Sequence, residues 1–398
     1  MKTNKVKHTI FIFAYWHDPR FKKKVGGLIK IFDLADNLTR LGNSVVLFLP
    51  KIGYPRKQTI SRVVEVPFID LPIIRPLSFH LLSTVFMLIK VIERPDIIYV
   101  RKMNSFLPLL LARLFKIPTF FEIPDDPYLA YKSSSMIKGS LEKKIDKYAM
   151  RLSAHILVPS AWSKQRLNQI GKIALAKITV VPSGTDTRLF KPMEKGKCCS
   201  RLGIDSSFNY IGFVGSFLIT QGIDTLIAAA QAVLSKHPDT RFLLVGDGPM
   251  MKTWKAKVSR KKLQETFIFV GQVPYKNVPK YIGAMDICVA PHRNDSFQSS
   301  PVKLFDYMAC ARPIVASDIG AVREITKNSG CALLVSPDKP DELAEGVKIL
   351  IEDKKLRKEM GKRGRKYVVE HFDRRKITAK LMNKLFDNTA NYYKRLYC

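Results

Sequence analysis

The stretch Ser299–Ser317, SSPVKLFDYMACARPIVAS, is predicted to form a polar turn, a short helix and then a buried strand. Proline is well tolerated at a helix start, because the missing N–H would have no partner there. The free amides and the dipole of such a start favour a phosphate. Lys303 adds a positive charge in the first turn, and Asp306 follows about one turn later. Two interpretations stay open: a diphosphate site with a carboxylate for sugar hydroxyls, or an ordinary helix with a surface Asp.

Working outward from this stretch, apolar runs of strand length alternate with helical patterns along most of the chain. This alternation is typical of α/β proteins with doubly wound parallel sheets. The expected strands are Thr9–Ala14, Ser44–Leu49, Asp96–Val100, Thr119–Glu122, His155–Pro159, Thr179–Val181, Tyr210–Gly215, Phe242–Val245, Phe267–Val270, Ile287–Ala290, Pro313–Ala316 and Ala332–Val335.

The length of 398 residues suits two domains. We expect an N-terminal Rossmann-like domain over residues 1–192, a linker over 193–207 and a second Rossmann-like domain over 208–373. The linker is expected because Phe190–Ser207 contains a proline, a glycine and scattered charge. Two such domains in tandem bind ligands in the crevice that faces the carboxyl ends of their strands.

Glycine-rich turns follow several of the expected strands. Gly26 and Gly27 lie between the first strand and a helix, Gly215 with Ser216 ends another strand, and Gly246 lies in the turn VGDGP (Val245–Pro249). Glycine lets the backbone approach a ligand closely, although any tight turn between a strand and a helix uses it too. Several such turns at one crevice, together with the Asp306 helix, favour a nucleotide-type ligand.

A pair of carboxylates follows an expected strand of the first domain, in Glu122–Tyr128 (EIPDDPY). Asp125 and Asp126 can position sugar hydroxyls or assist a proton transfer. The alternative is a solvated Asp-Pro turn without a role in chemistry.

A net charge of +33 indicates an anionic partner. The charge is spread over many elements, and no nucleic-acid-binding motif accompanies it, so an anionic membrane or an acidic acceptor is favoured over nucleic acid. The six cysteines show neither metal-ligand spacing nor a disulfide framework, which predicts no metal site and favours a reducing cytoplasm. The longest apolar segments are interrupted by charged residues, so a soluble or peripheral protein is expected.

Taken together, these motifs resemble the family 4 retaining glycosyltransferases (glycosyl transferases group 1), which have the GT-B fold. The markers are Gly26-Gly27, KITVVPSGTDTRLFKP (Lys177–Pro192), Val245–Pro249, AMDICVAPHR and PVKLFDYMACARPIVAS. The resemblance implies a nucleoside-diphosphate sugar donor held mostly by the second domain, in a cleft that faces the first. It implies an acceptor that approaches from the first domain, no metal or other cofactor, and a final helix over 374–398 that returns to the first domain.

The resemblance also implies residue roles. The catalytic candidates are Asp125, Asp126 and Gln298, and the donor-binding candidates are Gly26, Gly27, Gly215, Ser216, Gln221, Gly246, Ser299, Ser300, Pro301, Val302, Lys303 and Asp306. The chain departs from the family pattern where Asp306 and Gln298 replace two glutamates. Ser216 and Gln221 stand where an arginine and a lysine clamp the diphosphate. We expect Lys303 and the helix start to supply the missing positive field.

The function expected on these grounds is the transfer of a hexose, with retention, to a saccharide or lipid-linked acceptor in cell-envelope polysaccharide or glycolipid synthesis. The expected location is the cytoplasm or the inner face of the cytoplasmic membrane, with the basic first domain on anionic lipid. The alternative, motivated by the substituted contact positions, is a glycosyltransferase-like binding or partner subunit without turnover.

Overall fold

The computed structural model describes residues 8–14, 26–51, 59–69, 71, 74–91, 93–102, 106–125, 136–294 and 301–397. The chain divides into two compact units. The first unit comprises Met1–Pro182 together with Arg375–Cys398, and the second comprises Ser183–Arg374. Nearly all of the final helix, α15 (Arg374–Tyr397), therefore belongs to the first unit, as the family resemblance implied.

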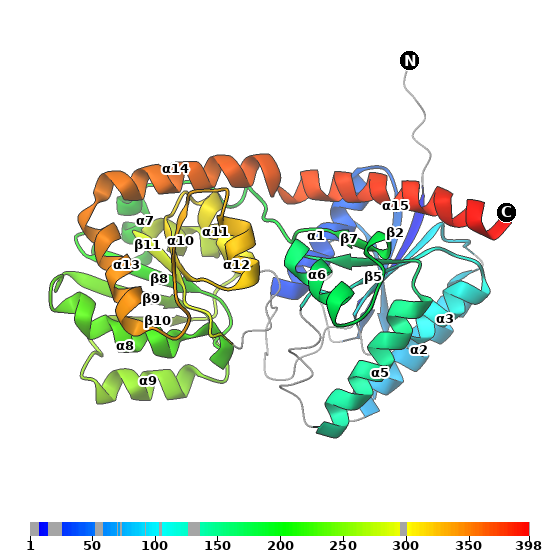
Figure 1. Ribbon diagram of the computed structural model, residues 1–398, viewed down its shortest axis with the longest axis horizontal. Helices are drawn as coiled ribbons and strands as arrows, with labels where there is room; N and C mark the ends of the chain where they lie inside the picture. The colour runs from blue at the N-terminus through cyan, green and yellow to red at the C-terminus, as the bar shows by residue number, and fades with distance from the viewer. Residues whose placement is uncertain are drawn as a thin grey trace, which may run out of the picture. The chain divides into compact units, whose positions relative to one another are not determined.

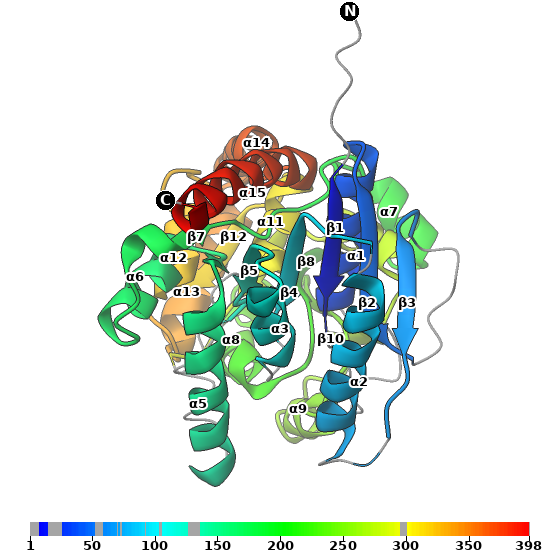
Figure 2. The same ribbon diagram turned by 90° about the vertical axis from the view of Figure 1, so that its right-hand side faces the viewer.

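The first unit is built on a parallel sheet of seven strands in the order β3-β2-β1-β4-β5-β6-β7 (Figures 1 and 2). Its strands are β1 (Thr9–Phe13), β2 (Ser44–Pro50), β3 (Arg62–Val66), β4 (Ile97–Arg101), β5 (Thr119–Glu122), β6 (His155–Val158) and β7 (Ile178–Val180). Its helices before α15 include α1 (Gly26–Arg40), α2 (Ile74–Val91), α3 (Leu107–Leu114), α5 (Met136–Leu152) and α6 (Ala161–Gln169).

Helices cover both faces of this sheet, which is why its strands are apolar at nearly every position. Alternate side chains of β1 point to opposite faces. Phe11 and Phe13 join one core cluster with residues of α2, α3, α5 and α6. Ile10 and Ile12 join the other cluster, which is closed by α1 and by Leu381 of α15.

The second unit contains a parallel sheet of six strands in the order β10-β9-β8-β11-β12-β13. Its strands are β8 (Asn209–Val214), β9 (Thr240–Val245), β10 (Phe267–Gly271), β11 (Ile287–Ala290), β12 (Ile314–Ser317) and β13 (Ala332–Val335). Its α-helices are α7 (Lys195–Leu202), α8 (Ile223–Leu234), α9 (Met251–Arg260), α10 (Val278–Ala284), α11 (Val302–Ala309), α12 (Gly320–Thr326), α13 (Pro340–Glu352) and α14 (Lys354–His371). Two core clusters again lie on the two faces of the sheet.

The predicted fold class is confirmed: all twelve expected strands are present, with ends shifted by at most two residues. Sequence analysis missed β3 (RVVEV), an edge strand that pairs only with β2. Two of its five residues are exposed, and only Val66 is buried. An edge strand of this kind lacks the continuous apolar run that marked the other strands.

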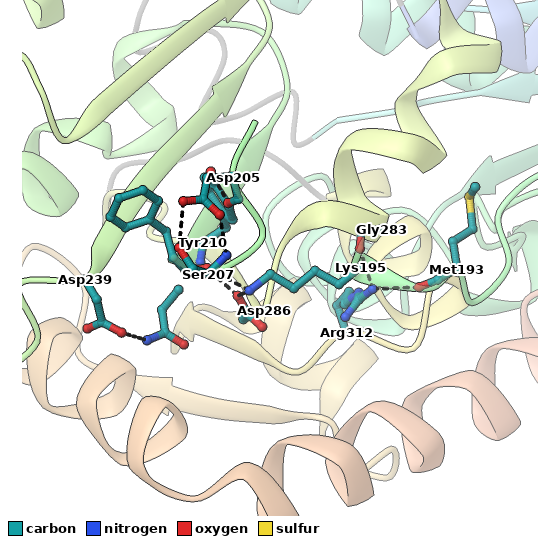
Figure 3. Close-up of polar contacts among 11 residues, drawn as sticks. Met193, Lys195, Asp205, Ser207, Tyr210, Asp239, Gly283, Asp286 and Arg312 are labelled. Atoms are coloured by element: carbon teal, nitrogen blue, oxygen red, sulfur yellow. Dashed lines mark hydrogen bonds and ion pairs between the residues drawn. The ribbon is translucent and has the colours of Figure 1, made fainter. Parts of the chain in front are cut away.

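The prediction of a linker over 193–207 is wrong, because this segment is part of the second unit. It contains α7, on which Cys198 and Cys199 are completely buried in the core. Figure 3 shows Lys195 reaching Asp286, to which its Nζ donates at 2.7 Å. Arg312 similarly donates to the carbonyl oxygens of Met193 (3.0 Å) and Gly283 (2.6 Å). Lys195, one of the charges that suggested a linker, thus has its ionic partner inside the folded second unit.

Replacing Lys195 tests this attachment. Lys195→Met leaves the largely buried Asp286 carboxylate without its cationic partner, so we expect the free energy of unfolding to fall by about 1–3 kcal/mol. Lys197→Met is the matched control, because its ion pair with Glu194 is exposed and should contribute less than about 0.5 kcal/mol. Urea denaturation of both variants gives the comparison. Equal, negligible effects would contradict a structural role for α7.

Candidate functional site

The candidate site lies where the second sheet reverses its winding. β9 and β10 extend the sheet on one side of β8, and β11, β12 and β13 extend it on the other. Open α/β sheets bind ligands at such a reversal, outside the carboxyl ends of the two central strands. Here β8 is followed by Gly215 and Ser216, and β11 is followed by Pro291 and His292. These residues define the floor of the site.

Lys303, in the first turn of α11, brings a positive charge to this floor. Its Nζ donates a hydrogen bond to Gln221 Oε1, lies 3.4 Å from His292 Nε2 and sits 4.5 Å from the centre of the Phe213 ring. In the described part of the chain no carboxylate pairs with it. Burial lowers the pKa of the Lys303 amine to about 7. The amine expected at this helix start is therefore held in place by Gln221, and no described carboxylate lies beside it.

Two loops hold the polar partners of Lys303 in place. Gln221 ends the 3₁₀ turn η3 (Ile219–Gln221) and is only 2% exposed. Gly222 follows with a φ of +67°, and a Cβ there would lie 1.7 Å from the carbonyl oxygen of Pro291. The loop after β11 is also tied to η3 by a bond from Arg293 N to Thr220 O, at 3.2 Å. The loops after β8 and β11 are thus packed directly against each other.

His292 was not among the predicted site residues. It is completely buried and is the second residue after β11. Its position at the end of an expected strand of the second sheet was the available signal. A single histidine at such a position was too unspecific to separate a site residue from a core residue.

Gly215 and Gly246 lie against each other at the ends of β8 and β9. Both have positive φ angles, +154° and +143°, and a Cβ on Gly246 would lie 1.8 Å from the carbonyl oxygen of Gly215. A side chain at Gly215 would in turn approach Cε of Lys303 to 3.2 Å. These glycines are therefore required by the packing of the floor itself. Their predicted contact with a donor stays a prediction.

Substitutions at Gly246 and Gly271 distinguish the stability cost of close packing from the cost of an unfavourable backbone conformation. Gly246→Ala adds a methyl group where the Gly215 carbonyl lies, whereas Gly271→Ala adds one in open space at a similarly positive φ of +82°. We expect Gly271→Ala to cost about 1–2 kcal/mol of unfolding free energy. Gly246→Ala should cost about 1–3 kcal/mol more. Thermal and urea unfolding measure both losses of unfolding free energy. Equal losses would mean that the backbone turns at Gly215 and Gly246 are not tightly packed against each other.

Asp306 lies one turn beyond Lys303 and is 7% exposed, so the interpretation as a surface aspartate is wrong. Its Oδ1 accepts a hydrogen bond of 2.5 Å from the hydroxyl of Thr185. Thr185 is fixed in turn, since its N–H donates to Phe372 O and its carbonyl accepts from Arg374 N. Burial raises the pKa of Asp306 to about 7, against the opposing effects of Thr185 and Arg374. One carboxylate oxygen is thus engaged, and contact of the other with a ribose stays a prediction.

The raised pKa of Asp306 determines whether stability rises or falls with pH. Between about pH 4 and pH 7 the folded protein holds a proton on Asp306 that the unfolded chain has lost, so this group lowers stability as the pH rises. Asp306→Asn removes the effect. We expect its unfolding free energy, relative to wild type, to increase by up to about 4 kcal/mol from pH 4 to pH 8.

Urea denaturation at the two pH values measures this difference. Asp341→Asn, at an exposed position of α13, is the matched control and should show no such trend. A wild-type-minus-Asn difference that does not change with pH would contradict a buried, proton-holding carboxyl at position 306.

The remaining predicted residues are distributed as follows. Gly26 and Gly27 begin α1, and Asp125 follows β5 with an exposed side chain; all three belong to the first unit. In the second unit Pro301 is buried and precedes the first helical residue, Val302. Its carbonyl accepts from Leu304 N at 3.0 Å, so this amide of the helix start already has a partner. Asp126, Gln298, Ser299 and Ser300 lie outside the described residues.

Among the described residues, no group of three or more His, Cys, Asp or Glu side chains is arranged to hold a metal ion. The absence of a metal requirement stays a prediction. No described helix combines the length and the apolar character that a membrane crossing needs.

Two family descriptions match the sequence, one on each unit. Glycosyltransferase Family 4 matches residues 29–189, and Glycosyl transferases group 1 matches residues 200–367. Both units have the doubly wound parallel sheet that these proteins share, with glycine turns and a basic helix start at the reversal of the second sheet. The chain belongs to the family 4 glycosyltransferases with the GT-B fold.

Solved structures agree with this fold. The chain is similar to sucrose-phosphate synthase from Thermosynechococcus elongatus, with a TM-score of 0.81 at 20% identity, over 98% of this chain and 99% of that one. It is also similar to Alr3699/HepE from Anabaena, solved in complex with UDP, with a TM-score of 0.76 at 18% identity, over 96% and 100% of the two chains.

Among characterised sequences, the chain is similar to alpha-D-kanosaminyltransferase from Streptomyces kanamyceticus. The two are 20% identical over 262 residues, which are 64% of this chain and 67% of that protein. The first three curated relatives are matched over 67%, 65% and 51% of their own length. The two family matches together establish the family of the chain.

Proposed function

We propose that the protein transfers a hexosyl group, with retention of configuration, from a nucleoside-diphosphate sugar to a saccharide or lipid-linked acceptor. The observation that carries this proposal is the half-buried Lys303 amine at the reversal of the second sheet. Its partners Gln221, His292 and Phe213 include no carboxylate. A diphosphate would supply the missing negative charge through charge-assisted hydrogen bonds. HepE from Anabaena, which shares the fold, was solved with UDP.

The same geometry would assist the chemical step. As the bond between the anomeric carbon and the diphosphate oxygen breaks, negative charge develops on that oxygen. An ammonium group already fixed by Gln221 stabilises this charge without reorganising, and a dry site strengthens the effect. In the proposed scheme the departing phosphate takes the proton of the acceptor, so the protein supplies no strong base. The free oxygen of Asp306 would bind the ribose, Gln298 the donor sugar, and Asp125 or Asp126 the acceptor.

The alternative function is a partner subunit that binds without turnover. It is motivated by the four substituted contact positions Asp306, Gln298, Ser216 and Gln221. The last two stand where the family pattern has cationic residues. The hydrogen bond from Lys303 to Gln221 brings a cation to one of these two positions from a different element. This relocated charge favours an active transferase. Transfer or hydrolysis of a nucleotide sugar by the pure protein separates the two functions.

The pKa of Lys303 provides a test that depends on this residue. A bound diphosphate raises the pKa of the amine, so binding takes up a proton above pH 7. The affinity advantage of wild type over Lys303→Met should be about 10- to 100-fold at pH 6. It should then shrink by up to about tenfold for each pH unit above pH 7. Calorimetry with UDP-, GDP- and ADP-sugars measures this affinity ratio and identifies the base that the protein binds. Nucleotide sugars are suitable ligands for this test, because their diphosphate has no group that titrates near neutrality and the pH dependence then comes from the protein.

The control is Lys252→Met, at an exposed position of α9 in the same unit, which should bind as wild type does at every pH. Comparing wild type with Lys303→Met at each pH removes the separate contribution of Asp306. Equal affinities of these two proteins for every nucleotide sugar that binds would show that the diphosphate does not contact Lys303.

A further inference from the structure

The first unit retains large hydrophobic side chains on its surface that its fold does not bury. Of the seventeen exposed large hydrophobic residues among those described, fifteen belong to the first unit and two to the second. Ten of them lie on α2, on α3 with its C-cap, and on α5: Ile74, Leu81, Val85, Leu88, Ile89, Leu110, Leu114, Phe115, Leu141 and Tyr148. Exposed apolar residues that gather on one side of a molecule mark an interaction site more often than single scattered ones do.

The three helices that carry these residues are neighbours. α3 lies between α2 and α5 on the same side of the sheet (Figures 1 and 2). The inward faces of the three helices fill the core with residues such as Phe79 of α2 and Leu109 of α3. On α2 the exposed Leu81, Val85 and Leu88 follow at helical spacing and form a second apolar stripe. We name this surface the outer α2–α3–α5 face.

Positive charge accompanies the apolar residues. Exposed basic side chains on α5 and at the end of α3 are Arg113, Lys116, Lys143, Lys144, Lys147 and Arg151. The sequences of α2 and α3 contain no acidic residue. Of the two on α5, Asp146 is buried and pairs with Lys102 at 2.7 Å, and Glu142 is half-buried. The outer α2–α3–α5 face is therefore apolar and cationic, with no exposed carboxylate on its helices.

We propose that the outer α2–α3–α5 face binds the surface of an anionic lipid bilayer. The leucine and isoleucine side chains would enter the boundary between headgroups and acyl chains, and the basic side chains would contact lipid phosphates. This occupant fits both properties of the face at once. A second copy of the chain fits poorly, because pairing two such faces would bring the same cations together.

This proposal is independent of the donor chemistry, because it involves no residue of the second unit. Its test therefore uses the full chain without a nucleotide. Co-sedimentation with sucrose-loaded vesicles of phosphatidylcholine and phosphatidylglycerol measures binding, and vesicles of phosphatidylcholine alone give the uncharged reference. We expect the partition coefficient to be at least about tenfold higher on the anionic vesicles and to fall with added salt.

Two sets of variants separate the two properties of the face. Leu81→Ser, Leu88→Ser and Leu114→Ser together should lower the partition coefficient by about tenfold. Ile349→Ser, at an exposed apolar position of the second unit, is its control and should not change it. Lys143→Gln, Lys144→Gln and Lys147→Gln together should also lower it by about tenfold. The control for charge is the triple Gln variant of Lys354, Lys355 and Lys358 on α14, which removes equal charge elsewhere.

Some outcomes would overturn the proposal. These are equal binding to both kinds of vesicle, an equal loss with the α14 variant, or a variant of the outer face that dissociates a dimer instead of lowering vesicle binding. Circular dichroism and nucleotide-sugar affinity, measured on every variant, report whether the fold is intact. If no nucleotide sugar binds to wild type or to any variant, the proposed function fails. The vesicle comparison still shows in that case whether the outer α2–α3–α5 face binds anionic lipid.

Discussion

The constraint on which the second unit depends is that its parallel sheet is buried on both faces. Helices carry the chain back between successive strands, so neither face of the sheet is available for polar chemistry. Polar groups can gather only beyond the strand ends, and the reversal between β8 and β11 leaves room for them there. The glycines after β8 and β9 let the backbone turns pack closely enough to form a floor. Lys303 and the residues it contacts, Gln221, His292 and Phe213, occupy that position.

One short helix, α11, carries two ionisable groups of opposite charge one turn apart. Lys303 and Asp306 are close enough in sequence for an ion pair, yet each points to different partners. Lys303 contacts Gln221, and Asp306 contacts Thr185. Burial lowers the pKa of Lys303 and, against the opposing effects of Thr185 and Arg374, raises the pKa of Asp306, so that both lie at about 7. The helix therefore bears an electrostatic cost that a ligand with a negative charge at one end and hydroxyl groups at the other would relieve.

The first unit uses helices in a different way. In α2 and α3 the inward face completes the core, while the outward face keeps apolar side chains in contact with solvent. A helix that served the fold alone would carry polar residues on that side. The second unit, with two exposed large hydrophobic residues among those described, follows the usual pattern. The difference between the units is one of surface chemistry, since their sheets have the same winding.

The sequence alone determined the alternation of strands and helices, and hence both doubly wound sheets, because buried parallel strands appear as continuous apolar runs. It did not reveal β3, whose residues are mostly exposed or half-buried, or the role of residues 193–207, whose cysteines pack in a core that composition does not show. It also identified the helix that carries Lys303 and Asp306. Only the tertiary structure decided what these side chains contact. Gln221 lies 82 residues from Lys303, and Thr185 lies 121 residues from Asp306. Such partners meet because the order of strands in the sheet brings distant chain segments to the same edge, and local sequence patterns do not encode that order.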